Sequence, residues 1–150
     1  GKIADKLGIN HYQILCPTTE ENIGLGVIGT LNNPMNSDDF IRFVQDVFDC
    51  SLRYIEPPAK LITTVAICGG AGAEFIKQAI NQKADLFITA DMKYHEMQAA
   101  HGQIGVVDMD HWVSEHFTRE IFEELLKGHI TTIVAERDAT PIRWIVKDKQ

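Results

Sequence analysis

Runs of apolar residues alternate with polar segments along the second half of the chain. Continuous apolar, β-branched runs predict strands that are covered on both faces of a sheet. Between them, apolar residues recur every three or four positions, which is the spacing of one face of a helix. The strands predicted in this half are 62–67, 86–89 and 104–108, and the helices are 73–81, 93–100 and 112–127. Two further strands are predicted at 130–135 and 142–146.

The first half of the chain is less regular. Residues 1–8 have the pattern of the end of a helix that Gly8 terminates. Ser37, followed by Asp38 and Asp39, is a favourable N-cap for a helix that ends near Asp49. The other segments predicted here are extended pieces at 12–15, 24–31 and 52–55 and a turn at 32–36.

This order of elements predicts one α/β domain over residues 1–150, with three α/β/α layers around a mainly parallel or mixed sheet. Ligands of open parallel sheets bind beyond the carboxyl ends of the strands. We therefore expect the functional residues in the segments 68–72, 89–91 and 108–111, which share one rim if their strands are neighbours.

The composition limits the classes of function. The 150 residues carry a net charge of −7, which disfavours general nucleic-acid binding because phosphates are neutralised by Lys and Arg. No stretch is apolar enough to cross a bilayer and no signal peptide is recognisable, so we expect no membrane partner and a cytoplasmic protein. The widely spaced Cys16, Cys50 and Cys68 form no CxxC motif, which argues against a disulfide framework or a cysteine zinc site.

The segment 108–115 carries the strongest candidate chemistry. His111 and Glu115 are four residues apart, so on a helix they lie on one face, one turn apart. An imidazole and a carboxylate suit zinc, manganese or iron(II). Two ligands are too few for a catalytic metal, and a helix N-terminal histidine with an exposed glutamate is the alternative.

Asp91 and His95 repeat this spacing after the preceding strand. They are candidates for acid–base catalysis or for positioning a water molecule. Alternatively, Asp91 caps the following helix and His95 faces solvent. Asp108, at a strand end, is a candidate for holding an imidazole in one tautomer, or for a helix cap.

Three glycines, Gly69, Gly70 and Gly72, lie between a predicted strand and a predicted helix. The backbone N–H groups of such a segment can contact an anionic substrate at the helix N-terminus. The pattern matches neither the dinucleotide-binding fingerprint nor the P-loop. A structural turn that needs positive φ is therefore the alternative.

Four motifs in this order resemble the NIF three-like family, whose members are also called GTP cyclohydrolase I type 2 homologues. The motifs are ENIGLGVIG at 21–29, VAICGGAG at 65–72, ADLFITADMKYHE at 84–96 and DMDHWVSE at 108–115. The resemblance covers nearly the whole chain. It implies the family's α/β fold, a pair of divalent metal ions in a cleft between two related halves, and assembly into toroidal homo-hexamers.

In the family pattern, a histidine pair and an aspartate from the N-terminal half join a histidine and a glutamate from the C-terminal half. The last two map onto His111 and Glu115. No His-His pair and no N-terminal aspartate motif occur here, so the chain resembles the C-terminal part of a family member, with a partial metal site or none. Asp110, Ser114 and Ala90 replace the usual Gly, Thr and Gly, and Asp110 adds a charge beside the metal position.

The resemblance implies a metal-dependent hydrolase that acts on a nucleotide-like or phosphate-bearing small molecule. Asp91 and His95 would position water or move protons, and the glycines would face the substrate. The alternative is a non-catalytic interaction or regulatory protein that uses metal for assembly, since the family was also named for a protein partner. A third hypothesis is a folded module without metal.

Overall fold

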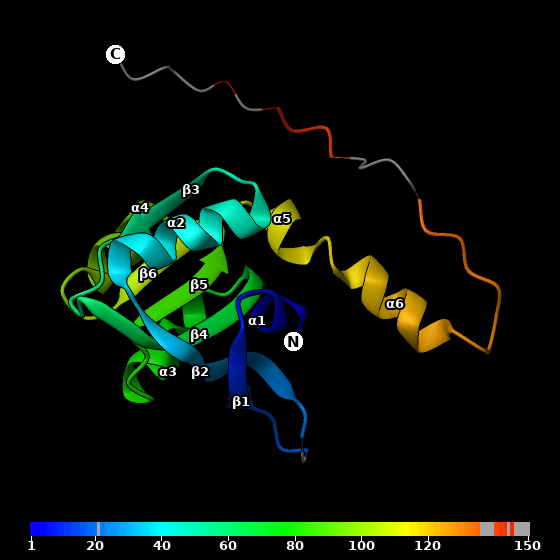
Figure 1. Cartoon of the computed structure of the whole chain (residues 1–150), viewed down its shortest axis with the longest axis horizontal. Helices are drawn as coiled ribbons and strands as arrows, with labels where there is room; N and C mark the ends of the chain where they lie inside the picture. Colours follow the sequence, from blue (N-terminus) through cyan, green and yellow to red (C-terminus); the bar gives the residue numbers. More distant parts are fainter. Residues whose placement is uncertain (21, 136–139, 144, 146–150) are drawn as a thin grey trace. The chain divides into compact units, whose positions relative to one another are not determined.

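The computed structural model describes residues 1–20, 22–135, 140–143 and 145 (Figure 1). Its six-stranded sheet has the order β1-β2-β4-β5-β6-β3. β4, β5 and β6 run parallel, whereas β1, β2 and β3 pair antiparallel with their neighbours. The mixed sheet confirms the predicted α/β class. The strands are β1 (Ile9–Pro17), β2 (Gly24–Asn36), β3 (Leu52–Ile55), β4 (Leu61–Ala71), β5 (Leu86–Ala90) and β6 (Gly105–Met109).

Helices cover both faces of this sheet. Successive side chains of a strand point to opposite faces, so each central strand contributes to two cores. On one face, shown in Figure 1 with α2 lying across it, Phe40 is fully buried in a cluster that includes Ile88. On the other face, Met97 of α4 packs in a cluster with Phe87. The helices of the unit that contains the sheet are α1 (Lys2–Lys6), α2 (Ser37–Phe48), α3 (Ile76–Asn81), α4 (Tyr94–Ala100) and α5 (His111–Glu115), with a 3₁₀ turn at Ala73–Phe75. The helix α6 (Thr118–Leu126) belongs to a separate unit.

The predicted turn at 32–36 is wrong, because β2 continues through it to Asn36. Pairing between β2 and β4 is irregular between Thr30 and Met35, and Pro34 falls in this stretch. The missing backbone N–H of Pro34 is tolerated here because the hydrogen bonding between the two strands is already interrupted. Asn36, rather than Ser37, caps α2, since its side chain accepts a hydrogen bond from the backbone N–H of Asp38 at 3.0 Å.

The predicted helix at 112–127 is two helices, α5 and α6, separated by a turn at residues 116–117. The turn directs Phe117 into the core, where its ring packs 5.9 Å from that of Phe48. The Nζ of Lys6 lies 4.7 Å from the centre of the same ring. Burial of this aromatic side chain favours the break over a continuous helix.

The strand predicted at 130–135 is also wrong, because these residues pair with no strand in the described part of the chain. An extended segment needs a partner for its backbone N–H and C=O groups. Of the strand predicted at 142–146, residues 142, 143 and 145 lie in no strand, and residues 144 and 146 lie outside the described residues. Residues 1–117 form one compact unit that contains the sheet, and residues 118–150 form a second. No helix among the described residues has the length and apolarity needed to cross a bilayer.

Candidate metal centre

The ends of β4, β5 and β6 lie side by side and carry the three segments in which functional residues are expected. Ala71 at the end of β4 pairs with Ala90, and Ala90 pairs with Met109 at the end of β6. Asp91 directly follows β5, and α5 begins at His111, two residues after β6. The parallel central strands therefore bring residues from three separate motifs to one rim.

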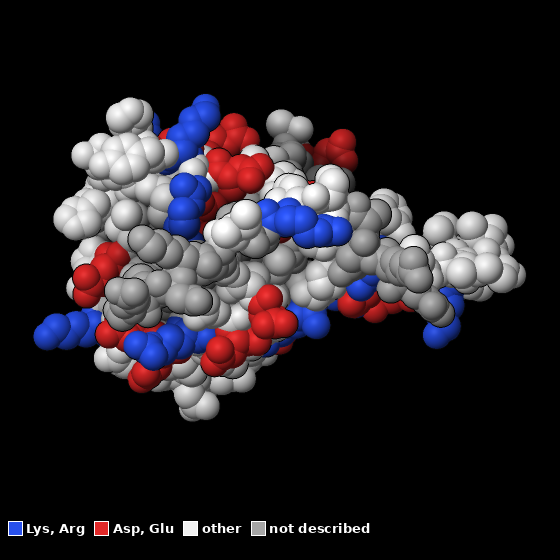
Figure 2. Space-filling model, turned by 90° about the horizontal axis from the view of Figure 1, so that it is seen from above, with Lys and Arg blue, Asp and Glu red and all other residues white. Residues whose placement is uncertain are grey.

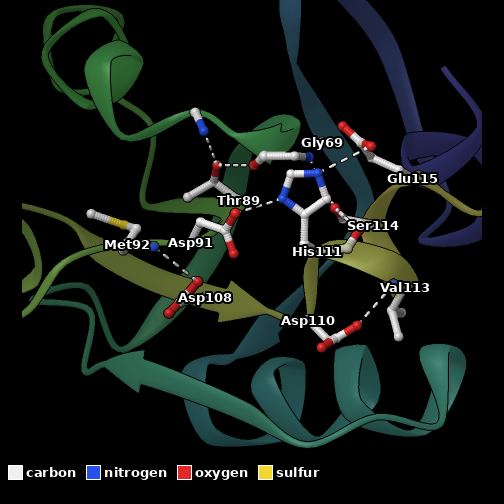
Figure 3. Close-up of polar contacts among 12 residues, drawn as sticks. Gly69, Thr89, Asp91, Met92, Asp108, Asp110, His111, Val113, Ser114 and Glu115 are labelled. Carbon is white, nitrogen blue, oxygen red and sulfur yellow. Dashed lines mark hydrogen bonds and ion pairs between the residues drawn. The ribbon is translucent and has the colours of Figure 1, made fainter. Parts of the chain in front are cut away.

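The ring of His111 lies between two carboxylates (Figure 3). Its Nδ1 is 2.6 Å from Oδ2 of Asp91, and its Nε2 is 3.1 Å from Oε2 of Glu115, one turn further along α5. All three side chains are accessible, with exposed fractions of 44% for His111, 55% for Asp91 and 54% for Glu115. The three side chains are therefore open to solvent.

The two carboxylates change the proton affinity of the ring. The hydrogen bond with Asp91 is the main cause that raises the pKa of His111 above its usual value, and burial partly opposes it. The negative charges of Glu115 and Asp91 raise this pKa further. When the ring is neutral with its proton on Nδ1 toward Asp91, the lone pair of Nε2 faces Glu115.

Asp91 has an unusual backbone conformation. Its φ of +56° is in the left-handed region, which residues other than glycine seldom adopt. The next residue, Met92, donates its N–H to Oδ1 of Asp108 at 3.3 Å and accepts a hydrogen bond at its C=O from Nη2 of Arg53 at 2.9 Å. Asp108 therefore holds the backbone beside Asp91, and the side chain that contacts the imidazole is Asp91 itself. Arg53 carries no sequence signal for this role, because no local pattern links β3 to this turn.

Gly69 and Gly70 lie in the bulged end of β4, and Gly72 follows the strand, directly before the 3₁₀ turn at Ala73–Phe75. Gly70 has a φ of +67°, and the pairing with β5 is irregular between Ile67 and Ala71. The N–H of Gly70 donates to Oγ of Ser114 at 2.9 Å, and its C=O accepts a hydrogen bond from Oγ1 of Thr89 at 3.1 Å. The buried hydroxyl groups of Ser114 and Thr89 thus fix the segment, a role that no local sequence pattern indicates.

Gly70 also lies directly against the candidate ligands. A Cβ at this position would collide with Oε1 of Glu115 and would lie 3.6 Å from Cε1 of His111. Gly72 donates its N–H to Oγ1 of Thr89 at 3.0 Å, and a Cβ on Gly69 would lie 3.1 Å from the backbone oxygen of Ser114. The glycines are needed for close packing against α5 and β5, which agrees with the structural-turn alternative for this segment.

One further candidate, His95, lies apart from this contact network. His95 is exposed on the first turn of α4, where its ring lies edge-on to that of Tyr94 at 5.4 Å. In the described part of the chain, no polar contact joins His95 to His111. The spacing from Asp91 to His95 is not helical, since α4 begins only at Tyr94. Asp110 caps α5, because its Oδ1 accepts a hydrogen bond from the N–H of Val113 at 3.3 Å.

The donor chemistry fits two positions around one divalent ion. An imidazole nitrogen and a carboxylate oxygen are donor types that divalent metals use, and Nε2 of His111 and Oε2 of Glu115 lie 3.1 Å apart, which is also the distance of an ion pair. Among the described residues, however, no group of three or more His, Cys, Asp or Glu side chains is placed to hold a metal ion. The chain supplies a pair of donors rather than a complete set.

Comparisons with known proteins give a consistent result. The model of the family described as Duf34/NIF3 (NGG1p interacting factor 3) matches residues 1–141. A GTP cyclohydrolase 1 type 2 homolog of Staphylococcus epidermidis is 36% identical over 110 residues, which cover 72% of this chain and 30% of that protein. A Staphylococcus aureus protein of the same description is 33% identical over 112 residues, 73% of this chain and 30% of its own length. The chain thus spans about a third of these relatives.

Solved structures share the fold. A hypothetical protein of Staphylococcus aureus superposes with a TM-score of 0.82 at 23% identity, over 95% of this chain and 62% of that one. A Bacillus cereus protein related to NIF3 superposes with a TM-score of 0.69 at 25% identity, over 86% of this chain and 38% of that one. The architecture described above is therefore that of a known group of proteins.

Proposed function

The chain belongs to the Duf34/NIF3 family, and we propose that it supplies part of a divalent-metal site in which His111 and Glu115 are ligands. The observation that carries the proposal is the orientation of His111, whose Nδ1 contacts Asp91 while Nε2 lies 3.1 Å from Oε2 of Glu115. Metal-binding histidines commonly donate one ring N–H to a carboxylate, which orients the other nitrogen toward the metal. Zinc, manganese and iron(II) suit this donor pair.

The rest of the coordination sphere lies outside the pair. Catalytic metals usually have three protein ligands, and centres with two metals need more. The aligned segment covers only 30% of the relatives' length. We therefore propose that the other ligands come from further parts of the complete protein, from a second copy in a homo-oligomer, or from water.

The reaction class that best suits such a centre is hydrolysis of a nucleotide-like or phosphate-bearing small molecule. A bound divalent ion acts as a Lewis acid and lowers the pKa of water. Asp91 keeps His111 oriented, and the exposed His95 is available to exchange protons with solvent. The description of the relatives as GTP cyclohydrolase 1 type 2 homologs supports a nucleotide-like substrate.

A metal titration tests the proposal directly. The purified chain is titrated with zinc, and separately with manganese, against a chromophoric chelator, together with His111→Ala and Glu115→Ala. Matched controls are His101→Ala and Glu56→Ala, whose side chains are exposed and outside the site. Binding that is lost in the first pair and retained in the controls supports the site. Equal binding in all four variants would contradict it.

A second candidate function is a protein-interaction module that uses metal for assembly. The family description, which names an NGG1p interacting factor, and the incomplete donor set favour this candidate. Light scattering with added zinc or with a chelator separates the two. Assembly that depends on metal and on His111, without turnover of any nucleotide substrate, favours the interaction module. Turnover that His111→Ala abolishes in an intact oligomer favours the hydrolase.

A further inference from the structure

Arg53 and Asp108 face each other across the β3–β6 pairing, where they are register partners. Nη2 of Arg53 donates to Oδ2 of Asp108. The Asp108 side chain is only 4% exposed, whereas that of Arg53 is 63% exposed. A buried carboxylate needs a charged or hydrogen-bonding partner, and Arg53 supplies both.

The same two side chains hold both backbone polar groups of Met92. Asp108 accepts its N–H and Arg53 donates to its C=O. The Met92 side chain is itself buried, at 3% exposure, in the core between the sheet and α4. The residue that follows Asp91 is therefore fixed through its main chain and its side chain, as Figure 3 shows for the contact with Asp108.

The backbone of Asp91 is in a conformation that surrounding contacts help to hold. A φ of +56° is less favourable for a residue with a Cβ than for glycine, although aspartate adopts it more readily than most residues do, and contacts around the turn stabilise it. In this conformation the Asp91 carboxylate reaches Nδ1 of His111. A relaxed backbone at Asp91 would redirect the carboxylate, because the side chain leaves the chain in a direction set by φ and ψ.

We propose that the Arg53–Asp108 pair is a positioning device that holds the turn after β5, so that Asp91 orients the imidazole of His111. The proposal rests on the proposed function for the role of His111 as a ligand, while the effect on ring orientation can be measured without metal. Neither Arg53 nor Asp108 touches the metal position in this scheme. Both act through Asp91.

The test compares Arg53→Gln with Asp91→Asn and with Arg42→Gln, a matched control on the exposed side of α2. The first readout is the nitrogen-15 NMR spectrum of the His111 ring in the metal-free chain, which reports its tautomer. The second is zinc affinity by chelator competition. We expect Arg53→Gln to shift the ring signals toward those of Asp91→Asn and to weaken zinc binding at least about tenfold, with no change in Arg42→Gln.

A double variant distinguishes an action of Arg53 through Asp91 from a purely structural role of Arg53. If Arg53 acts through Asp91, adding Arg53→Gln to Asp91→Asn changes neither readout further. Arg53→Gln leaves the buried carboxylate of Asp108 unpaired, which can impair folding. The variant Arg53→Gln/Asp108→Asn, in which both charges are removed, is therefore measured as well, and circular dichroism checks that each variant is folded. The proposal would be overturned if the losses of zinc affinity from Arg53→Gln and Asp91→Asn multiplied when the two substitutions are combined. It would also be overturned if a folded Arg53→Gln variant left the ring signals of His111 unchanged. If the wild-type chain binds no zinc, the proposed function fails, and the NMR comparison alone decides this inference.

Discussion

The carboxylate of Asp91 lies 2.6 Å from Nδ1 of His111, and this contact determines which ring nitrogen faces Glu115. An imidazole ring can rotate and exchange the positions of its two nitrogens, so a histidine without a partner presents either one. With Asp91 accepting the Nδ1 proton, Nε2 is left 3.1 Å from Oε2 of Glu115. The geometry of the candidate site therefore depends on a residue 20 positions upstream of the histidine.

Removing the charge of Asp91 should weaken metal binding while leaving the fold intact. Loss of an orienting carboxylate typically costs 10–100-fold in metal affinity, so about tenfold or more is expected for Asp91→Asn. Zinc titration measures the effect, and Asp46→Asn on the exposed side of α2 is the control. Equal affinities of the two variants would show that Asp91 has no orienting role.

Gly70 should tolerate no side chain beside the ligand pair. In Gly70→Ala the new Cβ meets the end of the Glu115 side chain, and the φ of +67° adds a cost of about 1 kcal/mol to folding. Gly102→Ala is a matched control, since Gly102 has a φ of +77° and a Cβ there would meet nothing within 4 Å. We expect similar losses of stability in thermal unfolding but loss of zinc affinity only in Gly70→Ala. If both variants keep full affinity, the close approach to Glu115 has no consequence for binding.

Ser114 should be required for the link between β4 and α5. Its buried Oγ accepts from the N–H of Gly70 at 2.9 Å and donates to the C=O of His111 at 2.9 Å. Ser114→Ala leaves a buried N–H without its acceptor, which should lower the free energy of unfolding by about 1–3 kcal/mol. Denaturant unfolding measures the loss, with the exposed Ser51→Ala as control. Ser114→Thr retains the hydroxyl group, and a stability as low as that of Ser114→Ala would argue against the hydrogen bonds as the cause.

The raised pKa of His111 predicts how the metal-free chain responds to pH. The hydrogen bond with Asp91 and the charge of Glu115 stabilise the protonated ring. This contribution is fully present below the unfolded pKa of about 6.5 and is lost as the pH rises through the higher folded value. Thermal stability should therefore fall as the pH rises above about 6.5. The fall should be smaller in His111→Gln, which lacks the titrating ring.

Metal binding should have the opposite pH dependence. A divalent ion requires the unprotonated Nε2, so zinc affinity should increase over the same pH range as the proton leaves. Titrations at several pH values measure this increase. The pH effect on the stability of the metal-free chain is reduced because water screens the charges around the His111 side chain, which is 44% exposed. A pH response that is identical in the wild-type chain and His111→Gln would assign it to other groups.

Much of the fold was predictable because buried strands and amphipathic helices have local signatures. The strands at 62–67, 86–89 and 104–108 correspond to β4, β5 and β6, and the helix after Asn36 corresponds to α2. The errors share a physical cause. The helix break at residues 116–117 follows from burial of Phe117 against Phe48, and the absent strand at 130–135 follows from the lack of a pairing partner among the described residues. Neither is a property of local sequence.

For the candidate site, the sequence by itself determined the residue types, the one-turn spacing of His111 and Glu115, and their location at a strand end. Only the tertiary structure decided that Asp91 orients the histidine, that Gly70 lies against Glu115 and that Arg53 supports the turn. Residue patterns report which positions are buried and how they repeat. Contacts between distant residues depend on strand order, register and the sign of φ at single positions, which are properties of the folded chain as a whole.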